Sequence, residues 1–166
     1  IALLEGEDPV VGVVHAPEAD EMFSAVAGEG ATLDGNPIAT TDRDSLDECM
    51  LLSGYDPDGT FLSHCYRETR GVRRLGSAAL NLCYLASGSA DAVWEYDTYR
   101  WDVAAGLVIA REAGARITTA DGTAYELNAD QAPRNELLGS NGAVHDDLLA
   151  HLGDEQALTE AGATSD

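Results

Sequence analysis

Lysine is absent from this chain of 166 residues, and its nine basic residues are all arginines. Thirty aspartates and glutamates oppose them, so the formal net charge is −21 at pH 7. So negative a chain repels nucleic acid and anionic membranes, and we expect neither as a partner. A surface of hydrated carboxylates stays soluble where salt screens their mutual repulsion. The composition therefore predicts a halophilic protein, and we expect its source to be an archaeon.

Cysteine is scarce, and long apolar runs are missing. The three cysteines, Cys49, Cys65 and Cys83, are odd in number and form no CxxC motif. This pattern predicts buried, reduced thiols in a cytoplasmic protein. No apolar run reaches the roughly 18 residues that a membrane span needs. The four histidines lack the spacing of metal ligands, so we interpret them as structural or surface residues.

The remaining composition is that of a globular α/β protein, with 45% hydrophobic residues. We expect one domain over residues 1–152 and a flexible acidic tail over 153–166. The opening segment, "IALLEGEDPVVGVVHAP", has no initial methionine and starts within a strand. We therefore expect the chain to be the later part of a longer protein.

The first half of the chain reads as short strands. Residues 1–5 and 10–16 predict a β-hairpin, and glycine turns continue it as a meander through residues 21–38. Residues 49–54 predict a buried strand, and residues 60–69 predict a helix.

From residue 72 the pattern alternates between strand and helix. Nearly all-apolar helices are predicted at 76–88 and 101–115, and they separate strands at 72–75, 91–96 and 116–119. Such alternation favours strands that run in parallel, with both helices packed on two sides at the centre of a layered fold. A strand at 135–141 and a helix at 145–152 follow. We predict an α/β fold with a mixed sheet packed by helices.

Three features fall on one edge of the predicted sheet. Residues 76–78, Gly-Ser-Ala, open the first apolar helix, so their free N–H groups can seat an anion. Glu95 ends the middle strand, and Asp102 lies at the start of the second apolar helix. Ligands of open α/β sheets gather at this edge, against helix N-termini. A carboxylate at a helix start can also serve only as a cap, which contributes about 0.5–2 kcal/mol.

The segment "WDVAAGLVIAREAGA", residues 101–115, resembles the carboxyl-terminal signature of the inositol monophosphatase family. Residues 71–96 and 10–38 are also similar to that family, and the resemblance covers about residues 1–152. Its members are Mg²⁺-dependent, lithium-sensitive phosphomonoesterases related to fructose bisphosphatases. The resemblance implies a layered sugar-phosphatase fold, of which this chain is the carboxyl-terminal part.

The resemblance also implies roles for individual residues. Asp102 matches a catalytic aspartate that ligates Mg²⁺, and Glu95 matches a glutamate that hydrogen-bonds a substrate hydroxyl. Gly76, Ser77 and Ala78 match a helix start whose backbone lies against the substrate. Oxygen ligands suit Mg²⁺, which clamps a phosphate and activates a water.

The family's other metal ligands come from a Gly-Glu-Glu motif and an Asp-Pro-x-Asp-Gly-Thr motif, which precede the region matched here. "DPDGT", residues 56–60, lacks one residue of the second motif and follows the meander. We interpret it as a turn.

Other residues near the expected site leave alternatives open. Two arginines, Arg73 and Arg74, could either bind a phosphate or form salt bridges. Two further residues, Tyr99 and Arg100, could line the mouth of the substrate site. Trp94 and Trp101 are expected to be packing residues.

We expect the intact protein to hydrolyse a small phosphorylated sugar or inositol, and to act as a homodimer. Inositol monophosphate is the first candidate substrate, fructose bisphosphate the second and phosphoadenosine phosphate the third. The alternative is a non-catalytic half-module, or an acidic interaction domain without the upstream metal-binding motifs.

Overall fold

A computed structural model describes residues 1–54, 59–127 and 135–152. Of the turn predicted at 56–60, residues 56–58 lie outside the described residues, and so does the tail predicted at 153–166. Thr60 is the first residue of a helix.

The first sheet is an antiparallel meander in which each strand pairs with the next along the chain. Its strands are β1 (Ala2–Glu5), β2 (Asp8–Ala16), β3 (Glu21–Val26), β4 (Gly30–Leu33) and β5 (Asn36–Ile38). The predicted hairpin is present, but its turn is tighter than expected. Pro9 lies within β2 and pairs with Leu4, so the turn is formed by Gly6 and Glu7.

The second sheet is mixed, as predicted. Its strands are β6 (Met50–Ser53), β7 (Gly71–Arg73), β8 (Ala92–Thr98), β9 (Arg116–Thr118) and β10 (Asn135–Ser140), in the order β7-β6-β8-β10-β9. β6 runs parallel to both β7 and β8, whereas β10 is antiparallel to both β8 and β9. The strands β7, β8 and β9 therefore share one direction, as their alternation with helices predicted. They are not neighbours, because β6 and β10 lie between them.

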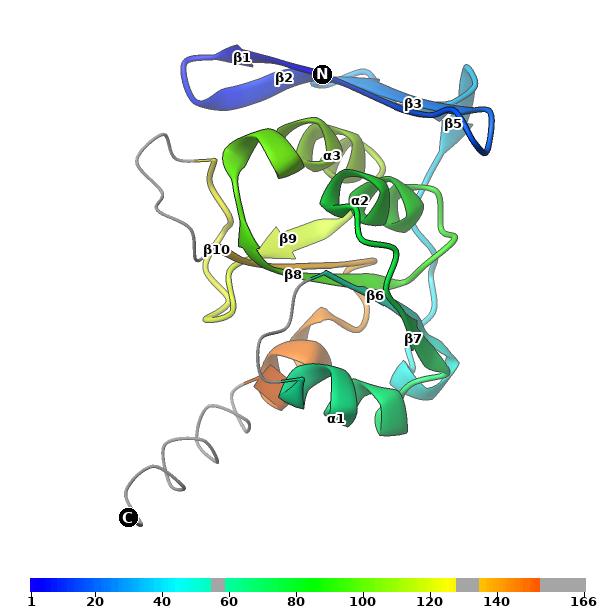
Figure 1. The fold of residues 1–166 in the computed structure, drawn as a ribbon, viewed down its shortest axis with the longest axis vertical. Coiled ribbons are helices and arrows are strands. Elements are labelled where there is room, and N and C mark those ends of the chain that lie inside the picture. The colour runs from blue at the N-terminus through cyan, green and yellow to red at the C-terminus, as the bar shows by residue number, and fades with distance from the viewer. Residues whose placement is uncertain (55–58, 128–134, 153–166) are drawn as a thin grey trace.

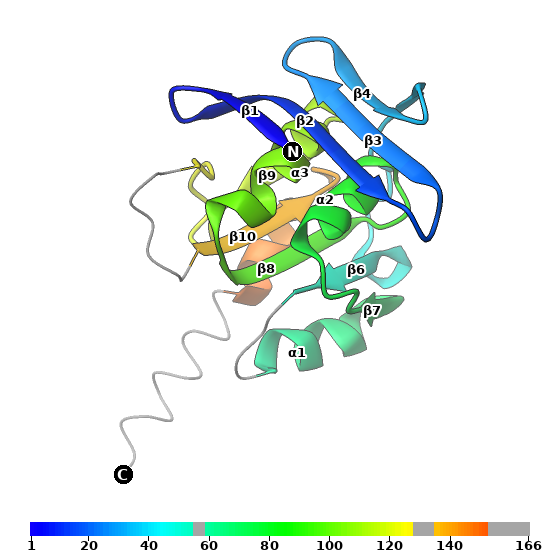
Figure 2. The same ribbon diagram turned by 45° about the horizontal axis from the view of Figure 1, so that its top comes forward.

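The helices form two layers. α2 (Ala78–Ala86) and α3 (Arg100–Glu112) lie between the two sheets, and α1 (Thr60–Glu68) and residues 145–152 lie on the other side of the mixed sheet (Figures 1 and 2). A single 3₁₀ turn, η1 (Leu46–Glu48), precedes β6. Within the described ranges, no helix combines the length and the apolar character needed to cross a bilayer.

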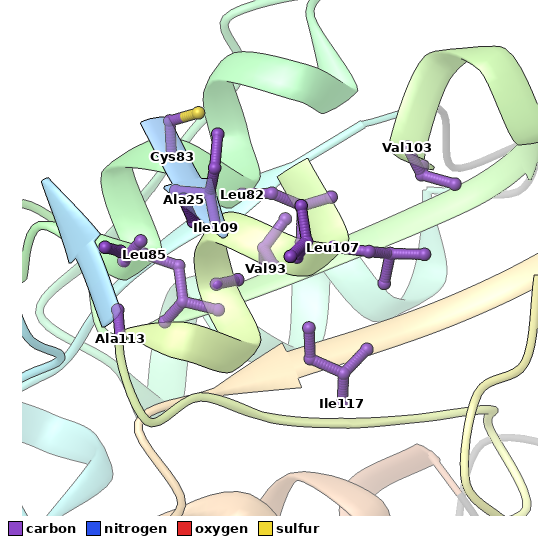
Figure 3. Packing of buried hydrophobic residues seen from close by; sticks show 14 of the residues in the cluster. Ala25, Leu82, Cys83, Leu85, Val93, Val103, Leu107, Ile109, Ala113 and Ile117 are labelled. Atoms are coloured by element: carbon purple, nitrogen blue, oxygen red, sulfur yellow. The ribbon is translucent and has the colours of Figure 1, made fainter. Parts of the chain in front are cut away.

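The all-apolar character of α3 follows from its position. Every residue from Val103 to Ala110 is buried, because one sheet covers one side of the helix and the other sheet covers the opposite side. Figure 3 shows Leu107 and Ile109 of α3 with Leu82 and Leu85 of α2, Ala25 of the meander and Val93 of the mixed sheet.

A second core lies on the other face of the mixed sheet. Along β8, Val93 belongs to the first core, while its neighbours Ala92 and Trp94 belong to the second. This alternation is that of a strand buried on both faces. Trp94 is thus a packing residue, as expected. The three cysteines are buried free thiols, also as predicted.

Two connections that leave neighbouring strands of the mixed sheet run over opposite faces of the sheet. The chain leaves β6 through α1 on one face and enters β7, and it leaves β8 through α3 on the other face and enters β9. Since β6 and β8 are adjacent parallel strands whose connections run to opposite sides, the sheet has a topological switch point between them. Ligands of α/β sheets bind outside the carboxyl ends of the strands at such a point.

Candidate active site

A notch opens at this switch point because β8 is longer than β6. The last residue of β6, Ser53, pairs with Trp94, and the Gly54 N–H donates to the Trp94 carbonyl at 2.7 Å. β8 continues to Thr98, two residues beyond the predicted end of the strand. Glu95 was predicted to end the strand, but it lies within β8. It is next to the point where β6 stops.

The notch belongs to a cleft of about 500 Å³. All five residues that the sequence proposed for the site line this cleft, namely Gly76, Ser77, Ala78, Glu95 and Asp102. The fold thus brings three segments together at the cleft: β8, the start of α2 and the start of α3. Gly54 and Arg74 also line it.

The start of α2 has the geometry of an anion-binding helix terminus. Gly76 has φ of 80°, a backbone conformation that glycine adopts without strain. Ser77 is the N-cap, and its hydroxyl accepts a hydrogen bond from Leu80 N at 3.3 Å. The first N–H groups of the helix lie at the cleft, where helix termini favour negative charge.

Glu95 is a buried carboxyl group with one strong partner. Only 2% of the residue is exposed, and Oε1 accepts a hydrogen bond from Asn81 Nδ2 at 2.5 Å. Burial raises the pKa of Glu95 to about 7, against the opposing effect of the Asn81 hydrogen bond. The charge of Asp102 raises this pKa further, and the charge of Arg74 lowers it. Near neutral pH, Glu95 can therefore accept a hydrogen bond as a carboxylate or donate one as an acid.

Asp102 has one carboxylate oxygen engaged in a helix cap. Its Oδ2 accepts a hydrogen bond from the Tyr99 N–H at 2.9 Å, in a capping box at the start of α3. Among the described residues, no donor meets its Oδ1. Asp102 is half-buried and lines the cleft. The capping role that the sequence left open is therefore present, and one oxygen is still available to a ligand.

The residues fit one side of a Mg²⁺ site. Mg²⁺ prefers carboxylate oxygens and keeps several waters, and Asp102 and Glu95 both line the same cleft. Within the described parts of the chain, however, no three histidine, cysteine, aspartate or glutamate side chains gather closely enough to hold a metal ion. The donors supplied here are thus suitable in kind but incomplete in number.

Some cleft residues were not identified from the sequence. Gly54 is the last residue of the strand predicted at 49–54 and directly follows β6. A glycine at the carboxyl end of a buried strand was the available signal. Asp97 also lines the cleft, and its φ of 59° is unusual for a residue other than glycine. Arg74, for which a phosphate and a salt bridge were both considered, lines the cleft, while Arg73 donates to the carbonyl of Val72 at 2.9 Å.

The expectation that Trp101 packs inside the protein was wrong. Trp101 is 73% exposed, lines the cleft and stacks on Tyr99 with ring centroids 4.7 Å apart. Trp101 lies in the first turn of α3, between the cleft and Ile1, Ala2 and Leu4 at the start of the meander. Tyr99 and Arg100, expected at the substrate mouth, are not among the described residues that line the cleft.

Known proteins are similar to this chain in sequence. An inositol-1-monophosphatase of Synechocystis sp. is 39% identical over 160 residues, which cover 92% of this chain and 54% of that protein. A fructose-1,6-bisphosphatase/inositol-1-monophosphatase of Thermotoga maritima is 37% identical over 151 residues, which cover 90% of this chain and 57% of that protein. The chain thus spans little more than half the length of these curated relatives.

Solved structures show the same fold. The inositol monophosphatase of Anabaena (Nostoc) sp. superposes with a TM-score of 0.84 at 35% identity, covering 92% of this chain and 62% of that one. A profile of the inositol monophosphatase family matches residues 1–157. With nearly the whole chain matched in both sequence and structure, the protein belongs to the inositol monophosphatase family.

Proposed function

We propose that the intact protein is a Mg²⁺-dependent phosphatase that hydrolyses a small phosphate monoester. The observation that carries this proposal is the gathering of Asp102, Glu95 and the N-terminus of α2 around one cleft at the switch point of the mixed sheet. Inositol monophosphate is the first candidate substrate and fructose bisphosphate the second, as in the names of the relatives from Synechocystis and Thermotoga. Phosphoadenosine phosphate is the third.

Each group in the cleft has a distinct task in this proposal. The N–H groups at the start of α2 bind and orient the phosphate, since the helix terminus favours an anion. Asp102 would hold Mg²⁺ through its carboxylate, and Glu95 would hydrogen-bond a hydroxyl of the substrate ring. When bound, the metal ion would neutralise phosphate charge and activate a water for attack on phosphorus.

The incomplete donor set supports a second candidate, a half-module that is not catalytic by itself. The family resemblance places the other ligands in a Gly-Glu-Glu and an Asp-Pro-x-Asp-Gly-Thr motif, both upstream of the matched region. Determining the sequence that precedes Ile1 in the intact protein discriminates between the two. If both motifs are present upstream, the protein is an enzyme as proposed. If both are absent, the half-module is supported.

The decisive variant is Asp102→Asn in the intact protein. Asparagine keeps an oxygen that can accept the Tyr99 N–H, so we expect the fold and the helix cap to survive. Loss of groups that only orient a metal ligand already costs about 10–100-fold. We therefore expect the kcat of Asp102→Asn to fall by more than about a hundredfold at saturating Mg²⁺.

Asp146→Asn is the matched control, because Asp146 is an exposed carboxylate that pairs with Arg116 away from the cleft. Its kcat and its Mg²⁺ requirement should equal those of the wild type. Activity of Asp102→Asn within about threefold of wild type would return Asp102 to the role of a helix cap.

A further inference from the structure

The Glu95 carboxylate is enclosed between two residues that the proposed mechanism does not use. On one side, Asn81 of α2 donates its amide to Oε1 at 2.5 Å. On the other side lies the backbone of Gly54. A Cβ added at Gly54 would stand 1.7 Å from Oε2 and 2.6 Å from Cδ of Glu95. The carboxylate thus occupies the space that a side chain at position 54 would fill.

Asn81 is an unusual residue for its surroundings. It lies in an apolar helix and is fully buried, and its side-chain oxygen meets no hydrogen-bond donor in the part of the chain that the structure describes. A buried polar atom without a partner destabilises a protein, and an apolar residue of similar size would avoid that cost. The unpartnered oxygen is a cost of having an amide at this position, and the other half of the amide accounts for it. Its N–H₂ group can only donate, and it donates to Glu95.

Gly54 is held in place by its own backbone. Its N–H donates to the carbonyl of Trp94, the residue directly before Glu95, at 2.7 Å. Gly54 is thereby tied to β8 next to the carboxylate. Because the clash would involve the Glu95 carboxyl group itself, even a methyl group at position 54 must displace the carboxylate.

We infer that Asn81 and Gly54 are positioning residues that hold Glu95 in one orientation and so determine selectivity for phosphate esters that carry a hydroxyl group near the phosphate. Asn81 occupies Oε1 from the side of α2. Oε2, on the side of Gly54, is then the oxygen that meets the substrate hydroxyl in the cleft. This inference rests on the proposed function, since it assigns how Glu95 performs the role given to it there.

The kinetic test compares two substrates on the intact protein in Mg²⁺. Inositol 1-phosphate carries ring hydroxyls, and p-nitrophenyl phosphate has none. Asn81→Ala and Gly54→Ala should each lower kcat/KM for inositol 1-phosphate by about tenfold or more and leave kcat/KM for p-nitrophenyl phosphate within about twofold. Cys83→Ala, a truncation of another fully buried residue in α2, is the control for packing and should affect both substrates equally.

A double-mutant cycle shows whether Asn81 acts through Glu95. Glu95→Gln alone should reduce turnover of inositol 1-phosphate selectively. Adding Asn81→Ala to Glu95→Gln should then cause little further loss, because the carboxylate that Asn81 positions is already gone. Independent, multiplicative losses would overturn the inference. A selective effect of Glu95→Gln without one of Asn81→Ala would overturn it while leaving the proposed function intact.

A structural measurement tests the positioning role of Asn81 and Gly54 even if the protein hydrolyses neither substrate. In crystals of Asn81→Ala and of Gly54→Ala, we expect the Glu95 carboxylate to leave its place beside residue 54. A carboxylate that stays in the same position in both variants would refute a positioning role. Inactivity of the wild type towards both substrates would, in contrast, count against the proposed function.

Discussion

Glu95 and His145 are buried ionisable side chains whose pKa values move in opposite directions for the same reason. Burial disfavours whichever form carries charge, so it raises the pKa of the acid Glu95 to about 7 and lowers that of the base His145 to about 4. The nearby charge of Arg116 also lowers the pKa of His145. Both groups therefore titrate within reach of ordinary buffers, one in the candidate site and one in the structural core.

His145 links three elements of the lower half of the molecule. Its Nδ1 lies 2.8 Å from the Ser140 hydroxyl at the end of β10, and its Nε2 lies 2.9 Å from the Thr118 hydroxyl at the end of β9. His145 is the first residue of the helix at 145–152, and it is completely buried. The histidine is thus structural, as its spacing predicted.

We predict that His145 contributes stability that is lost in acid. Its folded pKa lies below its unfolded value of 6.5, so the unfolded chain binds more protons between these two values. The contribution is complete above about pH 6.5 and falls by up to about 3 kcal/mol as the pH drops to about 4. Glu95 has the opposite sign, because its raised pKa favours the folded state at low pH, so the comparison needs a variant.

The measurement is the free energy of unfolding of wild type and of His145→Gln between pH 7 and pH 4. The wild type should be more stable at pH 7, and its advantage should shrink through this window. A difference between the two proteins that does not change with pH would contradict the prediction.

At the scale of elements, the meander packs on α3 so closely that one strand position excludes any side chain. A Cβ at Gly12 of β2 would lie 2.5 Å from the backbone oxygen of Ala105 and 2.4 Å from Cγ1 of Val108. A backbone oxygen cannot turn aside as a side chain can. The layer distance between β2 and α3 is therefore set by a glycine.

Gly12→Ala should separate these layers and destabilise the protein by about 1–3 kcal/mol, the usual cost of overpacking. Thermal unfolding followed by circular dichroism would show this as a lower Tm. His15→Gln, at an exposed position of the same strand, should leave Tm unchanged. An unchanged Tm for Gly12→Ala would mean that the two layers yield without cost.

At the scale of the whole molecule, the net charge of −21 dominates. The excess of carboxylates means that most acidic groups have no basic partner to offset their repulsion. The Debye length falls from about 10 Å at 0.1 M salt to about 3 Å at 1 M, so added salt removes repulsion that opposes the folded state. The halophilic surface, the homodimer and the cytoplasmic location that we predicted from the sequence all belong to this scale, and all three stay predictions.

We predict that Tm rises as KCl increases from 0.05 M to 2 M. Removing exposed charge should have a similar effect, so a variant with Glu5, Glu18 and Glu29 changed to glutamine should have a higher Tm at 0.05 M and a smaller dependence on salt. Differential scanning calorimetry of both proteins across the series provides the measurement. A Tm that stays flat or falls with KCl would show that repulsion does not limit stability.

The local pattern of the sequence was sufficient to predict the helices and strands and their approximate positions. Apolar residues on all sides of two helices required packing on two faces, and the helix cap at Ser77 follows from local hydrogen bonding alone. The motif around Asp102 was sufficient for the family. These features depend on residues close together in the chain, and the sequence displays such relations directly.

Tertiary structure alone decided which strands are neighbours and what surrounds each site residue. β6 lies between β7 and β8, and β10 between β8 and β9, because pairing depends on how the helices cover each face of the sheet. Asn81 precedes Glu95 by fourteen residues, and Gly54 precedes it by forty-one, yet both contact its carboxylate. Burial, the raised pKa of Glu95 and the exposure of Trp101 arise from contacts between distant segments, so a pattern of local spacing cannot contain them.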